Sequence, residues 1–267
     1  MIDIHCHLLP GMDDGAKTLE ESISMVRMAA ASGTTDIVAT PHANPRYCFD
    51  PELIERKVAE LRRATNDLVQ IHVGCDFHLS ATNIEDALAN PSKYTINHRS
   101  YVLVEFADFV IPPTSIEIFR RMRAAGMTPI ITHPERNRLL QADLEQIRRW
   151  VEDECLVQVT AQSFLGRFGK SAKDTADDLM TSGLVHFVAS DAHGPKDRTP
   201  DLAEAHRYVA SICGSGQAER LFVGNPKAAL LGEPLEWFDS MPRKRRRWYQ
   251  FFAKRSPGLV DSRQLGE

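Results

Sequence analysis

Short apolar segments alternate with amphipathic segments along most of the chain, and this alternation limits the possible folds. Seven segments are typical of strands, namely residues 1–5, 35–40, 70–75, 101–106, 128–133, 155–161 and 184–191. Segments with helical periodicity follow most of these strands, namely residues 18–33, 52–68, 115–126, 142–153, 172–183 and 201–214. Apolar strands that alternate with helices predict a parallel sheet covered on both faces. We therefore expect an α/β fold, and seven such units favour a closed or nearly closed barrel over two domains.

The domain organisation follows from the same pattern. The chain has 267 residues and an ordinary globular composition, and no linker is evident before about residue 235. We expect one domain over residues 1–235 and a tail over residues 236–267. The chain contains no apolar run long enough to predict a transmembrane helix, and its first residues do not resemble a signal peptide. Five cysteines are scattered along the chain without a CxxC pair, namely Cys6, Cys48, Cys75, Cys155 and Cys213. This pattern indicates reduced thiols in a cytoplasmic protein.

The predicted tail is strongly basic. Residues 243–255 contain seven of the 32 Lys and Arg residues and none of the 36 acidic residues. Trp248, Tyr249, Phe251 and Phe252 are interleaved with these basic residues. Basic and aromatic side chains together suit an anionic membrane surface. A nucleic acid, the acidic body of a neighbouring molecule and a purely solvated extension are the alternatives.

Histidines gather where predicted strands end. Five of the ten histidines lie at or just after such an end, namely His5, His7, His42, His133 and His193. Four carboxylates accompany them, namely Asp14, Asp76, Glu105 and Asp191. In β/α barrels the carboxyl ends of the strands carry the active site. Histidines that only fill a core would not be expected to gather at one edge, so the coincidence favours a metal site.

The spacing within two of these motifs suits metal binding. His5 and His7 are two residues apart, as are Asp191 and His193, and side chains at i and i+2 share one face of a strand. Glu105 lies inside the apolar run YVLVEF, where a cation would offset the cost of burying its charge. Nine candidate ligands exceed what one zinc ion takes, which predicts two or three metals. Mixed imidazole and carboxylate ligands suit manganese, iron or zinc.

Five motifs follow one another along residues 1 to about 235: DIHCHLLPGMDDGA, ATPH, VLVEF, THPER and SDAH. Together they resemble the PHP (polymerase and histidinol phosphatase) superfamily. The opening motif and the THPER block are similar to those of bacterial tyrosine-protein phosphatases from capsule and exopolysaccharide operons. The resemblance implies a distorted (β/α)7 barrel that binds three metals, commonly manganese.

The resemblance also implies a division of the ligands. The implied sites consist of His5, His7 and Asp191; of Glu105 and His133; and of Asp14, His42 and His193. The family usually bridges the first two metals with a glutamate after the third strand. At the matching position this chain has Asp76, which is one methylene shorter, and we favour it over His78 as the bridge. Asp13 is expected to cap a helix or to support the ligands.

The activity implied by the resemblance is the hydrolysis of phosphotyrosine by metal-activated water, on an autophosphorylated polysaccharide-export kinase. Arg136 and Arg198 are implied as phosphate-binding residues, since each follows a strand-end ligand and Arg pairs with phosphate through two N–H groups. Lys196 is a weaker candidate. The oligomeric state is left open.

Other functions are weighed against this one. A cysteine-dependent phosphatase is excluded, because no cysteine has an arginine six positions later, as a CX5R loop requires. A phosphatase for a small ester such as histidinol phosphate and a PHP-type nuclease are the enzymatic alternatives. Outside residues 243–255 the chain has 25 basic and 36 acidic residues, and this negative charge disfavours nucleic acid as a substrate. A non-catalytic scaffold is disfavoured by the near-complete ligand set.

Overall fold

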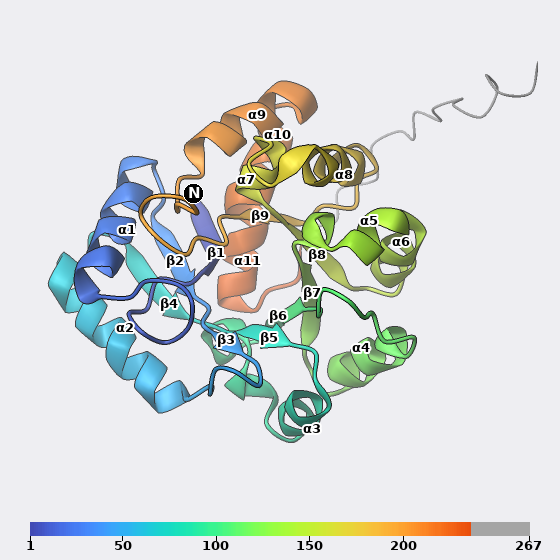
Figure 1. The fold of residues 1–267 in the computed structure, drawn as a ribbon, viewed down its shortest axis with the longest axis horizontal. Helices are drawn as coiled ribbons and strands as arrows, with labels where there is room; N and C mark the ends of the chain where they lie inside the picture. Colours follow the sequence, from blue (N-terminus) through green and yellow to red (C-terminus); the bar gives the residue numbers. More distant parts are fainter. Residues whose placement is uncertain (236–267) are drawn as a thin grey trace, which may run out of the picture. The chain divides into compact units, whose positions relative to one another are not determined.

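The computed structural model describes residues 1–235 and consists of parallel strands surrounded by helices (Figure 1). The predicted tail, including residues 243–255, lies outside the described residues. The strands are β1 (Ile2–Cys6), β2 (Asp36–Ala39), β3 (His42–Ala43), β4 (Gln70–Val73), β5 (Asp76–His78), β6 (Tyr101–Glu105), β7 (Thr128–Thr132), β8 (Leu156–Thr160) and β9 (Phe187–Ala189). They form sheets of order β1-β2-β4 and β3-β5-β6-β7-β8-β9.

The seven predicted strands are all present, and the further strands β3 and β5 follow the second and third of them, which gives nine strands among the described residues. Residues 40–41 separate β2 from β3, and residues 74–75 separate β4 from β5. Main-chain hydrogen bonds join the first and last strands, since Asp191 donates to the His5 carbonyl at 2.8 Å and His7 donates to the Ala192 carbonyl at 2.9 Å. The predicted fold class, a distorted (β/α)7 barrel, is therefore confirmed.

Helices of varied length connect the strands. They are α1 (Leu19–Ala31), α2 (Pro51–Thr65), α3 (Ala81–Ala89), α4 (Ser115–Ala124), α5 (Arg138–Ala142), α6 (Leu144–Glu152), α7 (Ala161–Phe164), α8 (Gly169–Thr181), α9 (Ala203–Cys213), α10 (Ser215–Glu219) and α11 (Asn225–Leu231). Short helical turns are η1 (Pro91–Lys93), η2 (Ile96–His98), η3 (Pro134–Arg136) and η4 (Arg220–Gly224). None of these helices is long and apolar enough to cross a membrane.

Local interactions explain where individual helices begin. Thr18 caps α1 by accepting a hydrogen bond from the Glu21 amide. The predicted helix over residues 142–153 is wrong at its start, because the Asp143 side chain accepts from the Gln146 amide and caps a helix that begins at residue 144. The five residues before Asp143 form the separate helix α5.

The last helix predicted from the sequence covers residues 201–214. In the structure, α10, η4 and α11 follow α9, so helices continue beyond that segment. Ala229 and Leu230 of α11 belong to an apolar cluster with Ile2 and Tyr101, which begin β1 and β6. This helix therefore covers the amino-terminal end of the barrel, behind the strands in the view of Figure 1. The functional side chains lie at the opposite, carboxyl end of the strands.

Candidate metal centre

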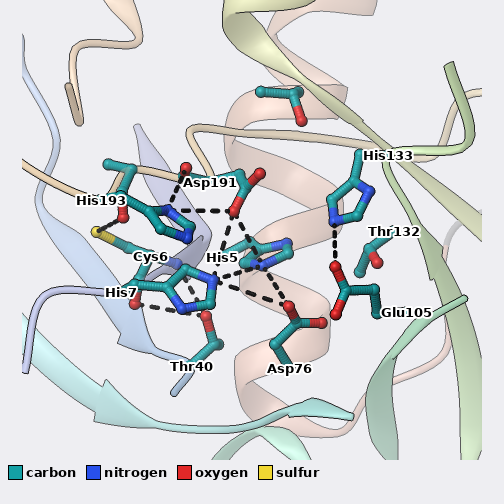
Figure 2. A network of polar contacts seen from close by, with 12 residues as sticks. His5, Cys6, His7, Thr40, Asp76, Glu105, Thr132, His133, Asp191 and His193 are labelled. Atoms are coloured by element: carbon teal, nitrogen blue, oxygen red, sulfur yellow. Dashed lines mark hydrogen bonds and ion pairs between the residues drawn. The ribbon is translucent and has the colours of Figure 1, made fainter. Parts of the chain in front are cut away.

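The nine predicted ligands all converge at the carboxyl ends of the strands. They form four overlapping groups whose ligand atoms lie within 4.8 Å of one another: His7, Asp14, His42 and His193; His5, His7 and Asp76; His5, His133 and Asp191; and His42, Asp76 and Glu105. Figure 2 shows His5 and His7 directed toward Asp76 and Asp191, with His133 facing Glu105. Segments far apart in sequence thus build one cluster of imidazoles and carboxylates.

Strand register brings several of these side chains together. His42 in β3 is paired with Asp76 in β5, and the next barrel strand, β6, ends at Glu105. His133 directly follows β7, and Asp191 lies two residues beyond β9. The parallel arrangement places all of these strand ends at the same edge of the barrel.

Distances within the cluster suit ligands that share cations. The Nε2 atoms of His5 and His7 each lie 3.4 Å from Oδ1 of Asp191. Nε2 of His133 lies 3.6 Å from Oε1 of Glu105. Metal–ligand bonds of ~2.1 Å in a tetrahedral site place neighbouring ligand atoms about 3.4 Å apart.

Buried polar atoms without hydrogen bonds provide a second test of metal binding. Asp76 is fully buried, and neither of its carboxylate oxygens has a hydrogen-bond partner. Nδ1 of His42 approaches Oδ2 of Asp76 to 3.0 Å but likewise makes no hydrogen bond. Burying such groups without hydrogen bonds is unfavourable, whereas a cation would bind their lone pairs directly. The donor set therefore fits divalent metals.

Two side chains outside the ligand set fix the orientation of imidazoles. Nδ1 of His7 donates to Oδ2 of Asp13 at 2.7 Å, and Nδ1 of His5 donates to Oε1 of Gln158 at 2.9 Å. Each hydrogen bond leaves the Nε2 lone pair of its histidine directed into the cluster. Asp13 thus forms a hydrogen bond with a candidate ligand, which agrees with one of the two roles expected of it. Gln158 was missed, and its only sequence signal is a single polar residue in an apolar strand.

The grouping of ligands differs in part from the implied division. His7 lies with Asp14, His42 and His193, as well as with His5. Asp76 belongs to two groups, one with the His5 and His7 imidazoles and one with His42 and Glu105. His78 belongs to none of the groups. The position favoured as the bridge is therefore the one that adjoins two groups.

The electrostatics of the cluster are dominated by burial and by neighbouring charges. Burial, together with the nearby Asp76 carboxylate, raises the pKa of Glu105 to about 8. Burial disfavours the ionised form of Asp76 as well, but the imidazoles of His5 and His42 hold its pKa well below the usual range. Carboxylates that compete for a few imidazoles create a site that positive ions would stabilise.

Two of the candidate ligands have unusual backbone geometry. His133 has φ of 34° and Asp191 has φ of 50°, values in the left-handed region that non-glycine residues adopt infrequently. Such conformations typically cost about 1–3 kcal/mol and cluster at functional sites. The surrounding barrel therefore holds these two ligands in place against a local conformational preference.

The two predicted phosphate-binding arginines lie beside the cluster. Arg136 ends η3, Arg198 lies in the loop before α9, and both guanidinium groups donate to Oδ2 of Asp191. The other oxygen of this carboxylate faces His5 and His7. The Asp191 carboxylate thus lies between the two arginines and the His5 and His7 imidazoles. Lys196 is exposed.

Cys6 lies between two of the ligands but faces away from them. Its side chain is fully buried, with Sγ 4.0 Å from the Ala192 carbonyl oxygen. Burial raises the pKa of the thiol well above its usual value, so a thiolate is disfavoured. The geometry agrees with the exclusion of cysteine chemistry from the sequence.

Comparisons with known proteins identify similar chains. Residues 1–231 match a family model described as capsular polysaccharide synthesis, CpsB/CapC. The chain is 34% identical to the tyrosine-protein phosphatase YwqE of Bacillus subtilis, over 94% of this chain and 100% of that protein. It is 35% identical to the putative tyrosine-protein phosphatase CapC of Staphylococcus aureus, over 74% of this chain and 79% of that protein.

A solved structure matches at the level of the fold and of the sequence. The matching chain comes from crystal structures of YwqE from Bacillus subtilis and CpsB from Streptococcus pneumoniae, which are described as metal-dependent tyrosine phosphatases. The TM-score is 0.83 at 32% identity, over 88% of this chain and 96% of that chain. The resemblance inferred from the motifs is thereby confirmed.

Proposed function

Because the chain belongs to the CpsB/CapC family of capsular polysaccharide synthesis, we propose that it is a metal-dependent protein-tyrosine phosphatase. The observation that carries the proposal is the convergence of nine imidazole and carboxylate ligands beside two arginines. Relatives named as tyrosine-protein phosphatases cover nearly the whole chain, which supports the same reaction here.

The metal content forms part of the proposal. Nine donors, at about three protein ligands per catalytic metal, would hold about three cations. Imidazole and carboxylate donors suit manganese, which we favour, and iron or zinc would also fit them. Bound divalent cations would polarise the phosphoryl group and supply a nucleophilic water near neutral pH.

The protein side chains would bind and orient the substrate. Arg136 and Arg198 are placed to donate hydrogen bonds to phosphoryl oxygens and to offset charge that develops on them. Asp191 holds both guanidinium groups at the edge of the ligand cluster before substrate binds. The leaving phenolate of tyrosine has a pKa of about 10, so its departure needs little help from an acid.

A comparison of substrates tests the proposed reaction. Protein reconstituted with Mn²⁺ would be presented with a phosphotyrosine peptide, a phosphoserine peptide, histidinol phosphate and single-stranded DNA. We expect the phosphotyrosine peptide to give the highest kcat/KM, and Arg136→Lys to lower that value because lysine loses the two-pronged contact. Faster hydrolysis of histidinol phosphate or of DNA would identify one of the other PHP activities and reject the proposal.

The proposed physiological substrate is an autophosphorylated tyrosine kinase of polysaccharide export, in the cytoplasm. We further propose that residues 1–235 form the catalytic domain and that residues 236–267 form a basic and aromatic tail that binds anionic membranes. Deletion of residues 242–267 should then abolish pelleting with vesicles containing phosphatidylserine. Pelleting that is unchanged by the deletion would reject the membrane role without affecting the proposed reaction.

A further inference from the structure

Both arginines beside the metal centre share one aromatic neighbour. Cζ of Arg136 lies 4.4 Å from the ring centroid of Phe168, and Cζ of Arg198 lies 5.9 Å from the same centroid. These distances are within the range of cation–π attraction. Since both guanidinium groups also donate to Asp191, one ring and one carboxylate define the position of the pair.

We propose that Phe168 is a positioning residue that holds Arg136 and Arg198 ready to bind phosphate. This inference rests on the proposed function, because it concerns the same phosphate-binding site. An acidic neighbour would hold a guanidinium group by occupying its N–H donors and offsetting its charge. The face of an aromatic ring attracts the cation without using those donors, so they stay available to phosphoryl oxygens.

The turn that carries Phe168 has a defined conformation. Gly166 and Gly169 have φ of 75° and 87°, in the left-handed region that glycine adopts without strain. The Arg167 amide donates to the Gln162 carbonyl at 3.1 Å, and the Gly169 amide donates to the Gly166 carbonyl at 3.0 Å. These bonds fix the backbone on both sides of the ring, so Phe168 can set the position of other groups.

Hydrogen bonds tie the segment before this turn to the loop that carries Arg136. Oε1 of the buried Glu135 accepts from the Thr160 amide at 3.0 Å and from the Ser163 hydroxyl at 2.7 Å. Glu135 immediately precedes Arg136 in η3. The end of β8 and the helix α7 are therefore hydrogen-bonded to the loop that carries Arg136.

The same segment also contacts the loop that carries Arg198. The side-chain amide of Gln162 donates to the Thr199 hydroxyl at 3.4 Å and approaches the Thr199 carbonyl at 3.5 Å. Thr199 immediately follows Arg198. Residues 160–168 thus connect both arginine loops and place the ring of Phe168 against both guanidinium groups.

Binding of inorganic phosphate to protein loaded with Mn²⁺ tests this inference, measured by isothermal titration calorimetry. Phe168→Leu keeps an apolar side chain of similar size but removes the ring, and we expect it to raise the Kd for phosphate about fivefold, within the range of a partly buried cation–π contact. Phe168→Tyr keeps the ring and is the matched control, with an expected Kd within about twofold of wild type. Melting temperatures and bound manganese would be compared for the three proteins.

A double-mutant cycle distinguishes positioning from a general loss of packing. In an Arg136→Gln, Arg198→Gln background, Phe168→Leu should change the Kd for phosphate by less than about twofold, because its targets are absent. Equal Kd values for wild type and Phe168→Leu, or the same fivefold effect in both backgrounds, would overturn the inference while leaving the proposed phosphatase activity intact. Failure of wild type to bind phosphate and to hydrolyse phosphotyrosine would overturn both.

Discussion

At the scale of single residues, the metal centre depends on which nitrogen of each histidine is available. Asp13 and Gln158 accept from Nδ1 of His7 and His5, and this leaves Nε2 of each ring for a cation. Without these acceptors each ring could rotate or change tautomer. We therefore predict that Asp13 and Gln158, which are not candidate ligands themselves, contribute to metal affinity.

Asp76 and His78 allow a direct test of the proposed bridging position. Asp76→Asn removes a buried charge that adjoins two ligand groups, so we expect loss of bound manganese and a fall in kcat/KM of more than about 100-fold. His78→Gln alters a residue outside the groups and should have a much smaller effect. Elemental analysis and phosphotyrosine hydrolysis would be measured for both variants, and a larger loss in His78→Gln would contradict the assignment.

Gln158 offers a test of the supporting hydrogen bond. Gln158→Leu removes the acceptor of His5 Nδ1 and should weaken manganese binding about 10- to 100-fold. Gln158→Glu keeps an oxygen acceptor at the same place and should retain more of the affinity. Titration of metal-free protein with Mn²⁺ measures both values, and equal affinities for wild type and Gln158→Leu would show that this bond is unimportant.

Sequence patterns indicate the candidate ligands more readily than the residues that would support them. His5, His42 and Asp191 can be recognised because metal-binding residue types lie at or just after the ends of apolar predicted strands, a pattern that burial alone does not favour. Gln158 and Phe168 have no such pattern, because their roles arise from contacts with residues far away in sequence. Long-range contacts of this kind appear only when the barrel is closed.

At the scale of elements, strand periodicity and helix caps account for most of the barrel. All seven predicted strands occur, since each apolar run is bounded by turn residues. The helices α3, α5, α7, α10 and α11 were not predicted, because each is short and short helices depend on tertiary packing for their stability. Asp143 gave a recognisable cap for α6, and it explains the shifted helix start.

Close packing of the loop after β1 makes Gly15 a sensitive position. A Cβ atom at Gly15 would lie 2.1 Å from the His7 carbonyl oxygen, so Gly15→Ala must displace the loop that carries Asp13 and Asp14. We expect destabilisation by about 1–3 kcal/mol, together with weaker manganese binding. Differential scanning fluorimetry and metal analysis would measure the two effects.

Gly216 in α10 provides the matched control for this substitution. A Cβ atom there has no neighbour within 4 Å, so Gly216→Ala should leave manganese binding unchanged and keep or slightly raise the melting temperature. Similar behaviour of the two alanine variants would contradict the role given to the loop.

At the scale of the whole molecule, buried His186 makes stability depend on pH. Burial, with a contribution from Arg220, lowers the pKa of His186 from 6.5 to about 4. The unfolded chain therefore takes up a proton near pH 6.5 that the folded protein resists until about pH 4. This contribution to stability is complete above pH 6.5, and about 3 kcal/mol of it is lost as the pH falls to about 4.

Denaturant unfolding of wild type and His186→Gln, both without metal, measures this contribution. Glutamine can still accept the hydrogen bond that the Val157 amide donates to His186 Nδ1 at 3.1 Å, but it does not titrate. We expect the difference in unfolding free energy between the two proteins to be constant above pH 6.5 and to decrease below it. A difference that does not change with pH would refute the buried neutral histidine.

The whole barrel brings strand ends from distant parts of the chain to one cluster of candidate ligands, which we propose binds cations. Anomalous diffraction at the manganese edge from crystals grown with Mn²⁺ tests this account most directly. We predict about three peaks, each bonded to nitrogen or oxygen atoms of the nine residues that converge at the carboxyl ends of the strands. Anomalous peaks confined to other places, or none within bonding distance of these residues, would contradict it.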